Sequence, residues 1–266
     1  MKFCSKVWLH TAAVVLFASM LVVGTANADS ITFIGSSGGL SASVEFLSAG
    51  TNLTVTLTNT STNDVLVPSN VLTAVFFTST DTSLARTSAL LGGGSTVFYD
   101  ADGQPAGGIV GGEWAYTTGV NLGGYGANSI ISSSGLDIVG PGDLFPGPDL
   151  QSPASPDGVQ YGILSAGDNT ATENGGITSS GGLIKNQVVF TLGNWGGGNA
   201  STAISGVTFQ YGTALDEGHY TGNCVNCVPT QPIPEPTSML LLGTGLVSLV
   251  RVCRKRKTIP AVPPAC

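Results

Sequence analysis

Strict alternation of apolar and polar residues in two neighbouring stretches limits most strongly what this chain can fold into. In LSASVEFL, residues 40–47, every second residue up to Phe46 is apolar, and the residues between these apolar ones are serine or glutamate. Residues 53–58 repeat this alternation with leucine and valine against threonine, and the intervening SAGT has the composition of a turn. A period of two residues is typical of a strand with one buried face. The two stretches therefore predict a β-hairpin.

Further strand signals predict an all-β fold. Residues 71–77, VLTAVFF, form a nearly continuous apolar run, as expected for a strand that is buried on both faces. Shorter candidates follow at STVFY, EWAYT, VQYGIL, NQVVFTL and GVTFQYG. We therefore predict an antiparallel β-sandwich over residues 29–223, jelly-roll or immunoglobulin-like in type. An N-terminal signal helix and a C-terminal hydrophobic helix are expected to flank it.

The first 28 residues predict a secretory signal peptide. Lys2 and Lys6 precede the apolar run AAVVLFASMLVVG at residues 12–24. Ala26 and Ala28 then supply the small residues that signal peptidase requires, so that Asp29 would begin the mature chain. The expected consequence is export, with signal peptidase as the first processing enzyme.

Charge is segregated along the chain, although the formal net charge is only −7. Between Asp29 and Pro236 there are two basic residues, Arg86 and Lys185, against 16 acidic ones, so that this segment carries a formal charge of −14. Such a segment repels phosphate backbones, which excludes nucleic-acid binding as its function. The acidic surface is explained either by solubility outside the cell or by the binding of cations.

The C-terminal stretch PIPEPTSMLLLGTGLVSLVRVCRKRK, residues 232–257, joins a proline-rich segment to an apolar run and a basic cluster. The uncharged run at residues 238–250 is shorter than the ~20 residues of a relaxed membrane span. The basic cluster after it would hold the far end in the cytoplasm. The prolines favour an extended backbone, which a processing enzyme can bind in its cleft. Together these features predict a transient membrane anchor.

This tripartite pattern resembles the PEP-CTERM sorting signal, which we assign to residues 234–257. The positions that match are Pro234, Glu235 and Pro236, and the basic residues Arg251, Arg254, Lys255, Arg256 and Lys257. The resemblance implies recognition by exosortase, a membrane-embedded cysteine transpeptidase of certain Gram-negative bacteria. It further implies removal of the tail from a periplasm-facing intermediate and delivery to the cell surface or an exopolysaccharide matrix. Residues 258–266 form a short extra tail, which departs from the usual pattern.

Catalytic motifs are not recognisable in the sequence, and we predict that the protein is not an enzyme. His219 is the only histidine of the mature chain, and no nucleophile-elbow motif accompanies it, although members of a Ser-His-Asp triad need not be adjacent. Four acidic residues could supply the pair of carboxylates that glycoside hydrolysis requires, but their spacing in the sequence does not single out any two of them. These residues are Glu45, Glu113, Asp100 and Asp102.

The segment YDADG, residues 99–103, resembles the start of a calcium loop. Asp100 and Asp102 are therefore weak candidates for a calcium site, but the third ligand and the distal glutamate of an EF-hand are missing. The alternative is a plain Asp/Gly turn. We expect no other cofactor.

Two cysteines, Cys224 and Cys227, begin a Cys/Pro-rich linker at residues 224–233. They cannot complete a tetrahedral zinc site alone. In an exported protein, the spacing favours a disulfide between them.

Two functions remain open at this level. The first is a non-catalytic surface or matrix protein. The second is an extracellular carbohydrate-binding module, assisted by calcium, whose partner would be an exopolysaccharide. Exposure of aromatic rings along one flat face would distinguish the second function from the first, because such rings stack on sugars. The rings in question are Trp114, Tyr116, Tyr125 and Trp195.

Overall fold

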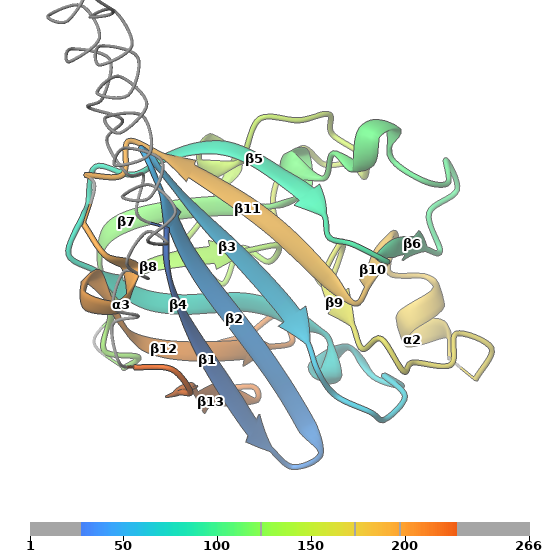
Figure 1. Ribbon diagram of the computed structural model, residues 1–266. Coiled ribbons are helices and arrows are strands. Elements are labelled where there is room, and N and C mark those ends of the chain that lie inside the picture. Colours follow the sequence, from blue (N-terminus) through green and yellow to red (C-terminus); the bar gives the residue numbers. More distant parts are fainter. Residues whose placement is uncertain (1–27, 123, 173, 197, 228–266) are drawn as a thin grey trace, which may run out of the picture. The chain divides into compact units, whose positions relative to one another are not determined.

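The computed structural model describes residues 28–227 except residues 123, 173 and 197, and we call this part the β-body. It contains two multi-stranded sheets and only short helices (Figure 1). The predicted all-β class is thereby confirmed. The signal helix and the hydrophobic helix that were predicted to flank the sheets lie outside the described residues. Within the described residues, no helix is both long enough and apolar enough to cross a membrane.

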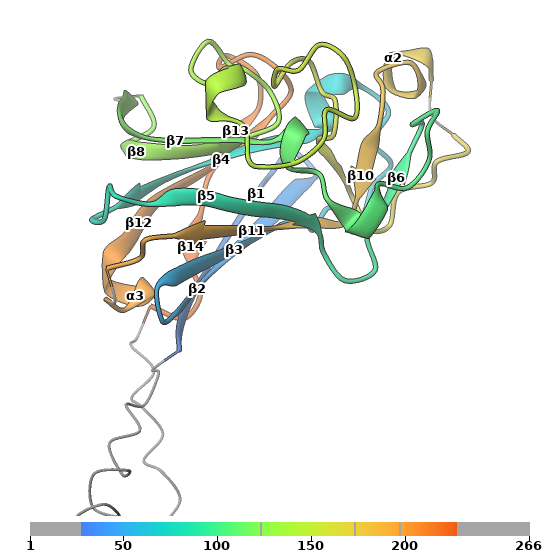
Figure 2. The same ribbon diagram turned by 90° about the horizontal axis from the view of Figure 1, so that it is seen from above.

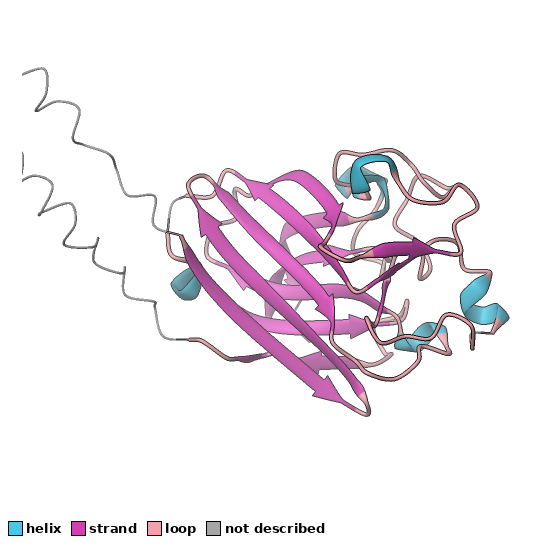
Figure 3. Ribbon diagram, turned by 45° about the vertical axis from the view of Figure 1, so that its right-hand side comes forward, coloured by secondary structure: helices cyan, strands magenta, loops and turns pink. Residues whose placement is uncertain are grey.

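The first sheet has six strands, and all neighbouring strands are antiparallel (Figure 3). In spatial order they are β14 (Asn223–Cys224), β1 (Asp29–Ser37), β2 (Leu40–Ala49), β3 (Asn52–Asn59), β11 (Gln187–Gly193) and β5 (Ala85–Leu91). Strands β2 and β3 form the predicted hairpin, in which Ala49 pairs with Asn52 across the turn.

The second sheet is built around β4 (Leu72–Ser79), which pairs with β12 on one edge and β8 on the other. Strand β13 extends the sheet beyond β12, and β7 extends it beyond β8. Three short strands, β9, β10 and β6, continue the sheet from the start of β4. Their bounds are β6 (Thr96–Phe98), β7 (Ala115–Leu122), β8 (Ala127–Ser132), β9 (Ile163–Leu164), β10 (Leu183–Lys185), β12 (Ile204–Tyr211) and β13 (His219–Thr221).

The helical elements are all three or four residues long and lie in the connections between strands. They are η1 (Pro68–Asn70), η2 (Ala106–Gly108), η3 (Gly111–Glu113), η4 (Pro141–Asp143), α2 (Gly175–Thr178) and α3 (Ala200–Ala203). Residues 140–158, which we call the Pro/Gly loop, contain only η4, because their prolines and glycines do not support a continuous ladder.

The main core lies between the two sheets, which form two layers in Figure 2. Alternate residues of β2 and β3 point into this core, and they meet alternate residues of β4 and β12. The rings of Phe46 from β2 and Phe77 from β4 are 5.0 Å apart. Burial of such large apolar side chains supplies most of the free energy that holds the two layers together.

Strand β4 is buried on both faces, as its apolar sequence predicted. Val75 and Phe77 face the main core, whereas Ala74 and Phe76 belong to a second apolar cluster. Residues of the connection after β8, among them Leu136, cover this second face. The strand therefore has no solvent-exposed side, and for this reason its sequence does not alternate between apolar and polar residues.

The first sheet contains the consecutive meander β1-β2-β3, whereas an immunoglobulin domain places its fifth strand beside its second. The immunoglobulin-like alternative does not match this order, and the jelly-roll alternative stays a prediction. Most of the predicted strand VQYGIL is also irregular. Only Ile163 and Leu164 pair as β9, because Tyr161 has a φ of 53° in a turn.

Candidate sorting site at the C-terminal exit

The last described residues attach to the outer edge of β1. Cys224 pairs with Phe33 and Asn223 pairs with Ile34 in antiparallel register. One residue further on, the backbone N–H of Val225 donates to the Thr32 carbonyl oxygen at 2.9 Å. The chain thus runs back along β1 toward the residue at which the β-body begins.

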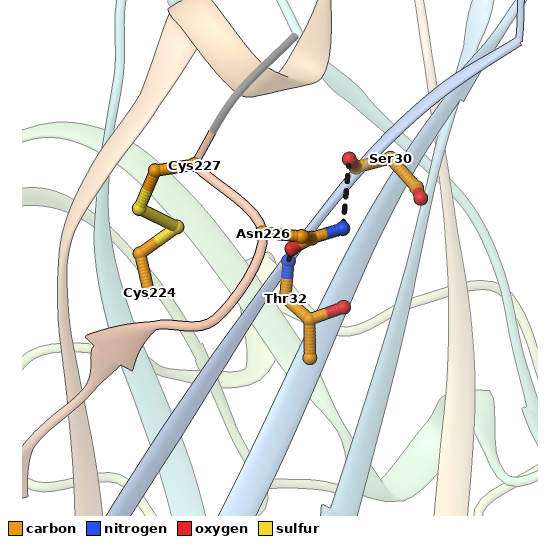
Figure 4. The surroundings of a disulfide bond; sticks show 5 residues. All are labelled: Ser30, Thr32, Cys224, Asn226 and Cys227. Carbon is orange, nitrogen blue, oxygen red and sulfur yellow. Dashed lines mark hydrogen bonds between the residues drawn. A yellow bond between two sulfur atoms is a disulfide. The ribbon is translucent and has the colours of Figure 1, made fainter. Parts of the chain in front are cut away.

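Asn226 continues this pairing with its side chain (Figure 4). Its Oδ1 accepts a hydrogen bond from the Thr32 backbone N–H at 2.7 Å, and its Nδ2 donates to the Ser30 carbonyl oxygen at 3.4 Å. A side-chain amide carries one acceptor and one donor group, as a peptide unit does. Asn226 therefore hydrogen-bonds through its side chain to backbone groups at the edge of β1, at the point where the backbone of the C-terminal segment leaves this edge.

A disulfide joins Cys224 to Cys227, with a Cα–Cα distance of 5.7 Å (Figure 4). It closes the short loop that contains Val225 and Asn226. We call residues 224–227, with their bonds to β1, the clasp. The clasp determines where the C-terminal segment leaves the β-body.

The N-terminal entry of the β-body lies beside this exit. Asp29 is buried, and its Oδ2 accepts a hydrogen bond from the Ser201 backbone N–H at 2.7 Å. The Ser48 hydroxyl donates to the Asp29 carbonyl oxygen at 3.2 Å. Ala28, the predicted last residue of the signal peptide, is exposed. The predicted cleavage site thus lies directly at the border of the folded region, and Ala26 lies outside the described residues.

Asp100 and Asp102 form an Asp/Gly turn. One oxygen of the Asp100 carboxylate accepts from the Asp102 backbone N–H at 2.8 Å, and the other accepts from the Tyr161 hydroxyl. The Gly103 N–H donates to the Asp100 carbonyl oxygen at 3.3 Å. In the described part of the chain, no three His, Cys, Asp or Glu residues are grouped to hold a metal ion. A calcium site here stays a prediction.

Glu113 is the most perturbed carboxyl of the β-body. It lies in η3 and is 2% exposed, and its Oε1 accepts from the backbone N–H groups of Leu150 and Gln151 at 2.6 and 3.0 Å. Burial raises the pKa of Glu113 to about 7, with Asp149 and Asp157 adding repulsion, and the two N–H donors oppose this change. Glu113 therefore holds the Pro/Gly loop to η3.

The remaining candidates for catalysis, Glu45 and His219, lie in different sheets. Glu45 is exposed on the outer face of the first sheet, in β2. His219 is exposed in β13, where its Nδ1 lies 3.2 Å from the Glu217 carbonyl oxygen. Of the four predicted carboxylates, Asp100, Asp102 and Glu113 all act electrostatically on Tyr161, whose pKa is raised mainly by burial and also by these charges.

The aromatic surface that sugar binding would require is not present at the predicted rings. Trp114, Tyr116 and Trp195 are 0%, 3% and 4% exposed, so they are core residues. Tyr125 is half-buried, and its ring stacks on that of Phe76 with the centroids 4.3 Å apart. These four rings therefore do not form the flat exposed face that would have favoured sugar binding, because three of them fill the interior.

Sequence reasoning did not find Asn226. Its partners are two backbone groups of β1, almost 200 residues away in sequence, and nothing in the local sequence CVNC indicates such a pairing. The only indication of this pairing would have been a predicted edge strand that lacks a partner. β1 itself was not among the predicted strands.

The predicted sorting residues, Pro234, Glu235 and Pro236 with the basic cluster, lie outside the described residues. Comparison with protein families finds the PEP-CTERM protein-sorting motif at residues 232–257. Comparisons with curated proteins and with solved structures find no match. A motif of this kind directs export and recognition by an exosortase. The chain therefore carries a PEP-CTERM protein-sorting motif, which follows the clasp in sequence.

Proposed function

We propose that this chain is a non-catalytic exported protein whose β-body is delivered to the cell surface or to an exopolysaccharide matrix. The observation that carries the proposal is the sorting motif at residues 232–257. The predicted signal peptide directs export, and the C-terminal motif then determines where the exported protein is released.

Each part of the C-terminal motif has a separate role in this proposal. Pro234, Glu235 and Pro236 form the recognition element, because two prolines fix φ and remove backbone donors, which keeps the peptide extended. The apolar run at residues 238–250 holds the element at the membrane surface. The basic cluster at residues 254–257 keeps the far end in the cytoplasm. Exosortase then removes the tail from this membrane-bound intermediate.

The clasp fixes the residue at which the segment that carries the motif leaves the β-body. Six residues, 228–233, separate Cys227 from Pro234, and a chain of six residues spans at most about 20 Å. The folded β-body is thus held close to the recognition element. The β-body itself supplies few groups that are poised for chemistry: Glu113 and Asp100 are engaged in internal hydrogen bonds, which supports a non-catalytic role.

Carbohydrate binding, assisted by calcium, is the alternative that the sequence left open. Its proposed ring surface is buried, so a sugar would have to bind elsewhere on the β-body. Within the described residues, no other contact favours this alternative.

The first prediction tests the recognition element directly. Glu235→Ala should leave export and membrane insertion unchanged but block tail removal, because it deletes the only charge between the two prolines. The matched control, Leu241→Val, changes the apolar run conservatively and should be processed normally. Both variants would be expressed in an exosortase-bearing host, and fractionation with intact-mass measurement would follow tail removal. Release of Glu235→Ala at the wild-type rate would contradict the assignment of the recognition element.

A further inference from the structure

Both described ends of the chain leave the β-body at the same end. Asn226 donates to the Ser30 carbonyl oxygen, so the clasp lies beside the start of β1. The turn between β2 and β3 is at this end too, because Asp29 pairs with Ser48. We call this the tethered end, and it comprises residues 28–29, 49–52, 80–83, 194–196, 198–203 and 226–227.

Hydrogen bonds join the loops of the tethered end into one surface. The Trp195 backbone N–H donates to the Thr51 carbonyl oxygen at 2.9 Å, and the Gly196 N–H donates to Asp81 Oδ2 at 2.7 Å. The Ser201 N–H donates to Asp29, as described above. The segment between β11 and β12 is therefore bound both to the β2–β3 turn and to the loop after β4.

The exposed side chains of this surface are uncharged. They are those of Ala28, Ala49, Thr51, Asn52, Thr80, Thr82, Ser83, Asn194, Asn199, Thr202 and Cys227. The two carboxylates of the tethered end are Asp29, which is buried, and Asp81, whose oxygens accept from backbone N–H groups of Ser83 and Gly196. Serine, threonine and asparagine side chains can hydrogen-bond to lipid phosphates and carry no charge that would repel them.

The opposite end of the β-body carries much of its acidic charge. Strand β3 runs from the tethered end to Asn59, and β4 begins at this opposite end with Leu72, which pairs with Tyr211 of β12. The loops that follow β3, β6, β8 and β12 there carry Asp64, Asp100, Asp102, Asp137, Asp216 and Glu217. We call this the free end. The fold therefore separates an uncharged end from an acidic one.

We propose that the tethered end is the surface that the β-body turns toward the anionic phospholipid headgroups of the membrane while its tail is still inserted. The proposal rests on the proposed function, since it requires the C-terminal anchor. Ten residues, 228–237, separate Cys227 from the apolar run at Ser238, and they span at most about 35 Å. The clasp brings the tethered end within this distance of the headgroups. The acidic free end is repelled by the same surface and points away.

The test places one photocrosslinking residue at Thr82 or, as the matched control, at Thr62. Both are exposed threonines in loops, the first at the tethered end and the second at the free end. The full chain would be inserted into vesicles of phosphatidylethanolamine and phosphatidylglycerol, and lipid adducts would be counted by mass spectrometry. We expect adducts from position 82 to exceed those from position 62 by about fivefold or more, the factor for about one repelled charge near an anionic surface.

Vesicles of phosphatidylcholine provide the second arm, because they carry no net charge. There the preference for position 82 should shrink markedly. Equal or greater labelling from position 62 in anionic vesicles would overturn the proposal, and so would a preference that is unchanged in phosphatidylcholine. Tail removal in an exosortase-bearing host is measured separately by intact mass. Failure of processing would contradict the proposed function, whereas the vesicle experiment contains no exosortase and reports only the orientation.

Discussion

Glu113 shows at the scale of a single residue how burial and hydrogen bonding compete. Burial favours the protonated carboxyl, whereas the N–H groups of Leu150 and Gln151 favour the carboxylate. The pKa of about 7 means that burial is the larger effect. In the unfolded chain the same carboxyl has a pKa near its ordinary value of 4.5. The folded protein therefore binds the proton more tightly than the unfolded chain does.

This difference predicts a pH dependence with a defined sign. Between pH 4.5 and about 7 the folded state holds more protons at Glu113, so the free energy of unfolding should fall as pH rises through this window. Glu113→Gln keeps an oxygen acceptor for both N–H groups but does not titrate. Relative to the variant, the wild type should lose at most about 3 kcal/mol across the window. Urea unfolding of both proteins at several pH values measures the difference, and parallel pH profiles would contradict it.

Gly112 is a second residue whose role is set by its immediate surroundings. A Cβ at this position would lie 1.8 Å from the Pro148 carbonyl oxygen, and the loop backbone would have to move. We predict that Gly112→Ala destabilises the β-body by about 1–3 kcal/mol, as overpacking typically does. Gly93→Ala is the control, since nothing lies within 4 Å of its Cβ position and its φ is not positive. Thermal unfolding should separate the two variants, and equal melting temperatures would refute the steric argument.

At the scale of elements, the clasp protects an edge strand. β1 would otherwise present unpaired N–H and C=O groups to solvent, and such edges promote association with other chains. β14 covers part of this edge with its backbone, and Asn226 covers the next part with its side chain. The element that ends the β-body thus also completes its first sheet.

This role predicts local changes in hydrogen exchange. Asn226→Ala removes both side-chain bonds to β1, so the Thr32 amide should exchange faster by roughly fivefold, as expected for a hydrogen bond worth about 1 kcal/mol. Asn226→Asp retains an acceptor for this amide and should restore most of the protection. The control is Val225→Ala, because the Val225 side chain is 63% exposed and its bond to β1 is made by the backbone. Unchanged exchange at Thr32 in Asn226→Ala would show that the amide is protected in another way.

The elements differ in how far the sequence predicts them. The β2–β3 hairpin is predicted because one face of each strand is buried and the other is not, which produces alternation. β4 is predicted because both faces are buried. β8, with the sequence ANSIIS, is also buried on both faces, but Ser129 and Ser132 hydrogen-bond internally and interrupt its apolar sequence. The burial of Trp114 and Trp195 could not be predicted from the sequence either, because composition does not distinguish a core ring from a surface ring.

At the scale of the whole β-body, the entry and the exit of the chain share one end. Local sequence does not predict this, because it depends on the pairing of β14 with β1. It has a direct consequence for processing. The predicted signal-peptidase site after Ala28 precedes the first strand, and the sorting motif follows the clasp in sequence. Both processing signals are therefore joined to the β-body at the tethered end.

The central claim is that this chain is exported cargo that loses both of its terminal signals. Intact-mass spectrometry of the protein recovered from the surface of an exosortase-bearing host tests this most directly. The account predicts a mass whose polypeptide begins at Asp29, retains the Cys224–Cys227 disulfide and lacks the apolar run from Ser238 onward. Reduction should raise this mass by that of two hydrogen atoms, because the reductant supplies two electrons and each sulfur gains a proton. A surface form that still contains the apolar run and the basic cluster would contradict the account.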